Sequence, residues 1–139
     1  MKQYTGTKTI NAKPMNRLDY NIFRGWDLPT DENGEDEGYL VEYIDGGKAN
    51  TTEYSGYVSW SPADVFDKAY SISDTFMDRL IIEHNELMTK LHKLHTYLET
   101  LTDEVPTGHE MLVKQQIIMK QYLKVLADRL ALYTVISND

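Results

Sequence analysis

The sequence contains no cysteine. The chain therefore has no disulfide, no thiolate nucleophile and no thiolate metal ligand, and this composition suits a reducing compartment. Long apolar runs are missing as well, because no segment approaches the roughly 18 uninterrupted apolar residues that would span a bilayer. The first ten residues, MKQYTGTKTI, lack the apolar run of a signal peptide. We therefore expect no membrane span and no secretory leader.

Basic side chains are scarce. The chain has 14 lysines and arginines against 22 aspartates and glutamates, which gives a formal net charge of −8. Long nucleic acids and anionic membrane surfaces both require a basic face, so this charge excludes them as partners. A small anion stays compatible with the composition, because two or three local arginines outweigh a distant acidic surface once salt screens it.

Motifs for catalysis are missing too. The sequence has no nucleophile elbow, no phosphate-binding glycine loop and no dinucleotide fingerprint. We therefore predict that the protein is not an enzyme and that it has no catalytic residues and no cofactor.

Two groups of residues raise the question of a metal. If Gly38 is placed at the required glycine of an EF-hand loop, Ile44 falls where a bidentate Glu is needed, so we interpret the acidic run at 31–37 as a solvated turn. His92 and His95 are three residues apart on an expected helix, but no metalloprotease pattern of flanking carboxylates accompanies them. We assign both histidines packed or solvated roles and predict no metal site.

Proline and glycine almost vanish after residue 70, where only Pro106 and Gly108 remain. We place a boundary here, between a β-rich region at residues 1–70 and a helical hairpin at residues 71–139. The expected fold class is α+β, with a small N-terminal antiparallel sheet followed by a C-terminal antiparallel two-helix hairpin. A chain of 139 residues buries only a modest core, so we also expect it to be oligomeric.

Alternating side chains predict three strands in the N-terminal region. The segment at 4–10 alternates with several threonines, which suits an edge strand. The strongest pattern lies at 38–44, and the segment at 56–60 is expected to pair with it in antiparallel fashion after a turn at 45–47.

Capping residues predict two short helices in the same region. Asn16 is the expected N-cap of the first, and Gly25 is expected to end it. Ser61 is the expected cap of the second, with Pro62 at the first helical position and an end near Tyr70.

The C-terminal region carries two apolar seams with heptad spacing, each with one polar member. The polar members are His84, which we expect to fix the helix register through a hydrogen bond, and Gln116. Thr107 and Glu110 form the pattern of a capping box for the second helix, and the short loop implies antiparallel neighbours. The first seam comprises Met77, Leu80, His84, Leu87, Leu91, Leu94, Leu98 and Leu101, and the second comprises Leu112, Gln116, Met119, Leu123, Leu126, Leu130 and Tyr133.

Each expected helix also has a second apolar row. An isolated hairpin would leave these rows in water, so we expect them to pack on the N-terminal region, on another subunit, or on both. The rows comprise Ile81 and Met88 on the first helix, and Val113, Ile117 or Ile118, and Val125 on the second.

Candidate ligand-binding residues are arginines and aromatic side chains. Arg24, Arg79 and Arg129 are three of the four arginines, and a guanidinium offers fixed donors that suit phosphate. Aromatic rings offer faces on which a base stacks, although each ring is equally suited to a core or an interface. The backbone amides at Thr107, Gly108 and His109 are a second place for phosphate, and a simple helix cap is the alternative there. The aromatic side chains considered for stacking on a base are Trp26, Trp60, Tyr39, Tyr43, Tyr57 and Phe76.

Three blocks carry a family resemblance. FRGWDLPTDENGEDEGYLVEYIDGG and GYVSWSPADVFDKAY resemble a segment common in phage and prophage proteins. MLVKQQIIMKQYLKVLADRL, with the helix before it, resembles the hairpin shared by two phage counter-defence families. One is the first-described anti-Thoeris type, a sponge for cyclic ADP-ribose isomers, and the other is the anti-CBASS cyclic-nucleotide sponge. The layout of a sheet followed by a hairpin is similar to the anti-Thoeris family over nearly the whole chain.

The resemblance implies a non-enzymatic sponge in the cytoplasm of the infected bacterial host. Such a protein binds the signal made by a TIR-domain enzyme and denies it to the effector. The family implies homo-oligomers, either dimers or trimers of dimers. It also implies a cyclic ADP-ribose pocket between the sheet region and the helices, and separate places for cyclic di- or trinucleotides near the hairpin turn.

Under this resemblance, Arg24 or Arg79 takes the pyrophosphate of the ligand. Trp26, Phe76 or a strand tyrosine such as Tyr39 stacks on adenine, and Asn85 reads a ribose or the adenine edge. Thr107, Gly108 and His109 hold the second ligand. Two other functions stay open: a phage structural or adaptor protein that uses the hairpin as a protein–protein interface, and a hydrolase that degrades the signal.

Overall fold

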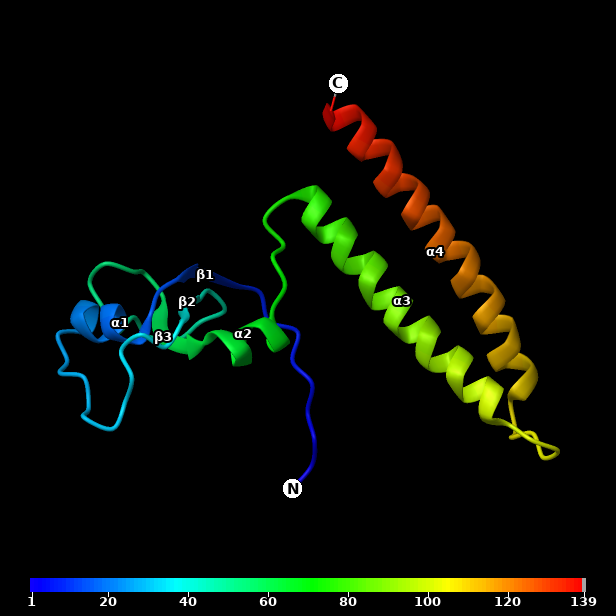
Figure 1. Cartoon of the computed structure of the whole chain (residues 1–139), viewed down its shortest axis with the longest axis horizontal. Helices are drawn as coiled ribbons and strands as arrows, with labels where there is room; N and C mark the ends of the chain where they lie inside the picture. Colours follow the sequence, from blue (N-terminus) through cyan, green and yellow to red (C-terminus); the bar gives the residue numbers. More distant parts are fainter. Residues whose placement is uncertain (139) are drawn as a thin grey trace. The chain divides into compact units, whose positions relative to one another are not determined.

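The computed structural model describes residues 1–138 and divides the chain into two compact units, Met1–Tyr70 and Ser71–Asp139. The first contains a sheet and two short helices, and the second contains two long helices (Figure 1). No helix among the described residues is long and apolar enough to cross a membrane. The two units are described separately below.

The first unit is built on a three-stranded antiparallel sheet in the order β1-β2-β3. The middle strand, β2, has its residue Leu40 paired with Lys13 on one side and with Trp60 on the other. This arrangement confirms the predicted antiparallel sheet. The elements of the unit are β1 (Ile10–Pro14), α1 (Arg17–Arg24), β2 (Gly38–Tyr43), β3 (Tyr57–Pro62) and α2 (Ala63–Ala69).

The predicted edge strand at 4–10 is wrong in position. The observed strand begins at Ile10, which lies opposite Tyr43, the last residue of β2. Because β2 ends there, residues 4–9 have no neighbouring strand within the described part of the chain.

Helix α1 has the caps that the sequence predicts. The Asn16 side chain accepts a hydrogen bond from the Asp19 amide at 2.8 Å. Gly25 ends the helix in the left-handed region, with φ 71°, which a residue without a Cβ adopts at little cost.

Helix α2 begins differently from the prediction. Ser61 and Pro62 are the last residues of β3, paired with Tyr39 and Gly38, so the Ser61 cap is wrong. The helix begins at Ala63, whose amide donates to the Glu37 carbonyl at 3.0 Å. A backbone carbonyl of a neighbouring segment therefore does what the predicted side-chain cap would have done. The helix ends at Ala69 with Tyr70 as its C-cap, close to the expected end near Tyr70.

The core of the first unit lies between α1 and the sheet. Tyr20, Leu40 and Val58 are buried together, and four partly buried hydrophobic side chains pack against them. The Trp60 indole donates to the Met15 carbonyl at 2.7 Å, so its one polar atom is paired. The surrounding side chains are Met15, Phe23, Tyr54 and Trp60.

The side chain of Asn50 pairs with the outer edge of β3, as a neighbouring strand would. The Asn50 amide donates to the Val58 carbonyl and accepts from the Val58 amide, both at 2.8 Å. The backbone groups of Val58 that face away from β2 are thereby paired.

The second unit is a hairpin of α3 (Phe76–Thr100) and α4 (His109–Asn138), which lie side by side (Figure 1). All members of both predicted seams are buried or half-buried, and Leu80, Met119 and Leu126 are the most buried of them. The seams therefore form the interface between the two helices.

The polar seam contact differs from the expected one. The Gln116 amide lies 2.8 Å from Nδ1 of His95, across the two helices. His84 instead contacts its neighbour Asn85 on the same helix, at 3.3 Å. The cross-helix hydrogen bond that can fix the register is therefore made by His95, not by His84.

The capping box also lies elsewhere. Gly108 has φ 86°, which cannot continue a helix, so α4 begins at His109 and the predicted box between Thr107 and Glu110 is wrong. A complete box is present at the start of α3, where Thr75 and Asp78 exchange side-chain and backbone hydrogen bonds.

We predict that Gly38→Ala destabilises the first unit by about 2–3 kcal/mol. A Cβ at this position would collide with the Ser61 carbonyl and the Trp60 ring. Gly6→Ala is the matched control, because a Cβ there meets nothing within 4 Å and the substitution is the same. Tryptophan fluorescence during urea unfolding reports on this unit, since Trp26 and Trp60 both belong to it. Equal midpoints for the two variants would contradict the close approach.

Candidate functional site

An aromatic and cationic cluster lies where the start of α3 meets the C-terminal part of α4. The rings of Phe76 and Tyr133 are 5.3 Å apart and nearly perpendicular. The Arg129 guanidinium lies 5.9 Å from the centre of the Phe76 ring and 5.8 Å from that of Tyr133. Phe76 keeps 49% of its surface exposed. The cluster thus offers a ring face and a cation together, and both belong to the hairpin of α3 and α4.

The structure directs Arg79 toward backbone carbonyls. Its Nη1 donates to the carbonyls of Ser73 at 3.0 Å and Asp74 at 3.3 Å, so the guanidinium fastens the segment that leads into α3. Asn85 is nine residues beyond Phe76, which at about 100° per residue puts it on the opposite side of the helix. The structure therefore does not bring Phe76 and Asn85 together on α3.

The first unit has its own pair of a cation and a ring, at the end of α1. The Arg24 guanidinium lies 4.3 Å from the centre of the Trp26 ring, and its Nη1 donates to the Tyr20 hydroxyl at 2.9 Å. Gly25 makes this possible, because its left-handed conformation turns the chain back so that the Trp26 amide donates to the Asn21 carbonyl. Trp26 is 52% exposed.

Tyr39 is held by another aromatic side chain. Its ring stacks on Phe66 of α2 with centres 3.9 Å apart and planes within 17°. Phe66 also contacts Tyr70, at 5.1 Å. One face of the Tyr39 ring is therefore occupied from within the unit.

The hairpin turn presents the third group of predicted residues. Thr107 and Gly108 form the turn, and the His109 amide donates to the Pro106 carbonyl at 3.1 Å. That bond uses one of the amides that a phosphate at this helix start would need.

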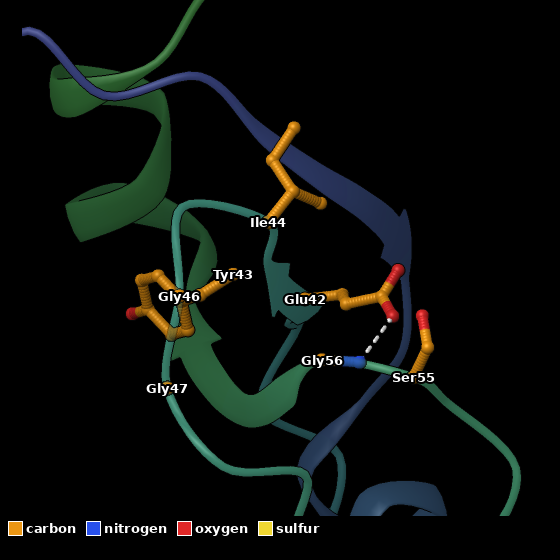
Figure 2. Close-up of a pocket in the computed structure, with 7 residues that line it drawn as sticks. All are labelled: Glu42, Tyr43, Ile44, Gly46, Gly47, Ser55 and Gly56. Carbon is orange, nitrogen blue, oxygen red and sulfur yellow. Dashed lines mark hydrogen bonds between the residues drawn. The ribbon is translucent and has the colours of Figure 1, made fainter.

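A cavity of about 230 Å³ lies at the end of the sheet, where β2 runs into the following loop. Figure 2 shows the Glu42 side chain pointing toward the Gly56 amide, which donates to Oε2 at 3.0 Å. A carboxylate in the wall repels a pyrophosphate, so this cavity suits donors such as hydroxyl or amino groups. Of the candidate ligand-binding residues it contains only Tyr43, and its lining is Glu42, Tyr43, Ile44, Gly46, Gly47, Ser55 and Gly56.

The acidic run is held against α1 by Arg17. Its Nη1 lies 3.2 Å from Glu32, and its Nε lies 3.4 Å from Asp36 in an ion pair that is not an aligned hydrogen bond. The guanidinium also stacks on Trp60 at 4.5 Å. The amide of Arg17 donates to the Asp36 carbonyl, and that of Leu18 to the Gly34 carbonyl. The run therefore closes the N-terminal end of α1 while its side chains stay exposed.

Metal-binding groups were sought in the described part of the chain. It contains no group of three or more histidine, aspartate or glutamate side chains arranged to hold a metal ion. His95 contacts Glu99 at 3.0 Å and Gln116 at 2.8 Å.

Comparison with protein-family models finds one match. Residues 74–132 match the family described as Sequestin. The matched segment covers most of α3 and α4 and less than half of the 139-residue chain. The hairpin is thus similar to a family whose name denotes sequestration, which favours a binding protein over an enzyme. Neither the curated proteins nor the solved structures contain a match to this chain.

Sequence reasoning did not bring Arg129 and Tyr133 together with Phe76 in one site. Arg129 was grouped with the phosphate-binding arginines, and Tyr133 was assigned to the seam only. An antiparallel hairpin sets the start of one helix beside the end of the other, and the contact of Gln116 with His95 gives the register that places both near Phe76.

We predict that Arg17→Gln lowers the stability of the first unit by about 1–2 kcal/mol, because a half-buried guanidinium loses two carboxylates and a ring at once. Lys8→Gln is the matched control, since Lys8 pairs with Asp45 while both side chains stay about half exposed, at 49% and 48%. Its effect should stay below about 0.5 kcal/mol. Urea unfolding followed by tryptophan fluorescence measures both, and similar shifts would show that Arg17 does not hold the loop.

Proposed function

We propose that this protein is a phage counter-defence sponge. It binds cyclic ADP-ribose isomers made by bacterial immune sensors and sequesters them, without degrading them, in the cytoplasm of the infected host. The observation that carries the proposal is the cluster of Phe76, Arg129 and Tyr133, in which the Phe76 ring is 49% exposed and which lies on the hairpin that matches a sequestering family.

The chemistry of the cluster fits the ligand. A cyclic ADP-ribose isomer carries an adenine, a pyrophosphate and two riboses. The exposed face of Phe76 stacks on the adenine. Arg129 forms no ion pair with a described side chain, so its guanidinium is available for the pyrophosphate. Tyr133 supports the ring from the side.

Arg24 and Trp26 are proposed as ligand-binding residues of the first unit. Arg24 spends one donor on Tyr20 and is not ion-paired within the described residues, so most of its guanidinium remains available. Tyr39 presents one ring face, the other being covered by Phe66. Arg79 retains the donors on Nε and Nη2 for a phosphate, and Asn85 retains its amide donors for a ribose or an adenine edge.

The hairpin turn is proposed as the place for cyclic di- or trinucleotides. Thr107 and Gly108 would meet a phosphate at the helix start, and His109 and Lys114 supply the nearest positive charge. No lysine or arginine lies between Lys93 and Lys114. We therefore expect this second binding to be weak.

A sponge must supply more binding sites than there are signal molecules, and an oligomer provides several sites in one assembly. The proposed assembly is a homo-oligomer, a dimer or a trimer of dimers, formed through the hairpin. Exposed apolar residues on both helices supply the surface for it, among them Ile81, Met88, Ile118 and Val125.

The same apolar surface favours a second candidate, a phage structural or adaptor protein whose hairpin is a protein–protein interface. The two functions differ in one measurable respect: an adaptor has a protein partner whose binding is unaffected by nucleotides.

We predict that cyclic ADP-ribose isomers bind with a Kd below about 1 µM, a free energy of about −8 kcal/mol, in calorimetry with a panel of isomers and cyclic trinucleotides. Heat denaturation of the complex should release the ligand unchanged in liquid chromatography. An altered ligand would make the protein a hydrolase. No binding across the panel would leave the adaptor as the function.

We predict that Phe76→Ala and Arg129→Gln each weaken cyclic ADP-ribose binding about 10- to 100-fold, through a lost stacking face and a lost charged hydrogen bond. Arg24→Ala should weaken it as well. Tyr97→Ala is the matched control for the ring, since Tyr97 is an aromatic residue of α3 with 46% exposure. Lys124→Gln is the control for the charge on α4. If the controls weaken binding as much as the cluster variants, the site assignment is wrong.

A further inference from the structure

Glu42 gives the cavity at the end of the sheet a negative charge that has no counter-ion. The side chain is half-buried, and no lysine, arginine or histidine in the described part of the chain forms an ion pair with it. Lys13, on the neighbouring strand β1, instead has its ammonium 5.9 Å from the centre of the Tyr54 ring. A carboxylate that is partly withdrawn from water without a counter-ion is costly, and a bound cation removes that cost.

The hydrogen bonds of Glu42 leave acceptor capacity free. Oε2 accepts from the Gly56 amide at 3.0 Å, and Oε1 lies 3.4 Å from the side-chain nitrogen of Asn11. Figure 2 shows only one of the two carboxylate oxygens hydrogen-bonded to a residue of the cavity. Because a carboxylate has about four acceptor positions, positions remain for a further donor.

The loops around Glu42 keep the carboxylate in place and add few side chains to the cavity wall. A Cβ at Gly56 would collide with the Tyr43 carbonyl and crowd Cγ of Glu42, so a larger residue there would displace the carboxylate. Gly46 and Gly47 line the same cavity and contribute only backbone. The cavity therefore has room beside a fixed negative charge.

The Tyr43 ring already contacts one ammonium group of the chain. Nζ of Lys8 lies 4.7 Å from the centre of this ring and 3.1 Å from Oδ2 of Asp45. The ring is held in position, because its hydroxyl accepts from the Ser59 hydroxyl at 3.3 Å and its edge contacts the Tyr57 ring, with centres 6.2 Å apart. An aromatic face beside a carboxylate is a favourable environment for an ammonium group. The position of Lys8 thus shows which ligand chemistry suits these surroundings.

We propose that this cavity binds a small aliphatic amine in its ammonium form, with the Glu42 carboxylate as its counter-ion and the Tyr43 ring as an apolar wall. Its volume of about 230 Å³ is below the roughly 300–1,000 Å³ of pockets for drug-sized ligands, so the amine is small. The net charge of −8 adds a general attraction for cations. This inference does not rest on the proposed function, because the candidate ligand cluster belongs to the other unit and takes an anion.

A titration of the isotope-labelled full chain with butylammonium chloride, at constant ionic strength, measures binding through amide chemical shifts in NMR spectra. The amides of Gly46, Gly47 and Gly56 line the cavity, so their signals should move together and give a Kd of about 1–5 mM. Butanol is the matched neutral probe. It has the same carbon chain without the charge and should leave the three signals unchanged up to about 20 mM.

Three single variants test the assigned roles. Glu42→Gln should raise the Kd about tenfold or more, because the amide oxygen still accepts from Gly56 but carries no charge. Glu53→Gln is the matched control, since Glu53 is an exposed glutamate of the loop before Gly56, and it should change the Kd less than about twofold. Lys8→Gln should lower the Kd about two- to fivefold, because it removes a competing ammonium and leaves Asp45 unpaired.

Three results would overturn the proposal. One is that the signals of the three glycines stay in place up to about 20 mM butylammonium. Another is that butanol moves them as far, which would mean that the cavity binds apolar chains regardless of charge. The third is an equal effect of Glu42→Gln and Glu53→Gln, which would leave Glu42 as an acceptor for the Gly56 amide and nothing more. All three are measured without a nucleotide, so failure here is distinct from failure of the sponge function.

Discussion

The apolar seam between α3 and α4 is the constraint on which the second unit depends. Leu80, Met119 and Leu126 are buried there, and the described part of the two helices buries no polar side chain to the same degree. Their burial sets which layers of the two helices lie opposite each other, and the contact between Gln116 and His95 fixes the register. That register places Phe76 in contact with Arg129 and Tyr133 of α4, which are more than 50 positions later in the chain. The candidate ligand cluster is therefore a product of helix packing and not of a local motif.

Periodicity and capping chemistry predicted much of the fold, because both act over a few residues. The strand at 38–44, the cap at Asn16, the end at Gly25 and both seams all follow from local spacing. The errors arose where a distant segment decided the outcome. Ser61 resembles a helix cap, but its pairing with Tyr39 keeps it in β3. The alternation at 4–10 is that of a strand, but β2 ends at Tyr43 and provides no neighbour for it.

The candidate site could be predicted by residue type but not by geometry. The chain has only four arginines, so these could be chosen from composition, and Arg24 does lie against Trp26. The sequence could not show which guanidinium groups already have protein partners in the fold. Arg17 is committed to Glu32 and Trp60, and Arg79 is turned onto backbone carbonyls. The cavity beside Glu42 left no signal beyond its glycines, because several loop segments contribute to its wall.

The side chain of Asn50 has a consequence for how the protein behaves at high concentration. By satisfying both backbone groups of Val58, it removes the docking point that an outermost strand otherwise offers to stray extended peptides. On the far strand, β1, Lys13 and Pro14 discourage such pairing by charge and by the missing proline donor. Both outer strands of the sheet are thereby guarded against uncontrolled sheet growth and aggregation.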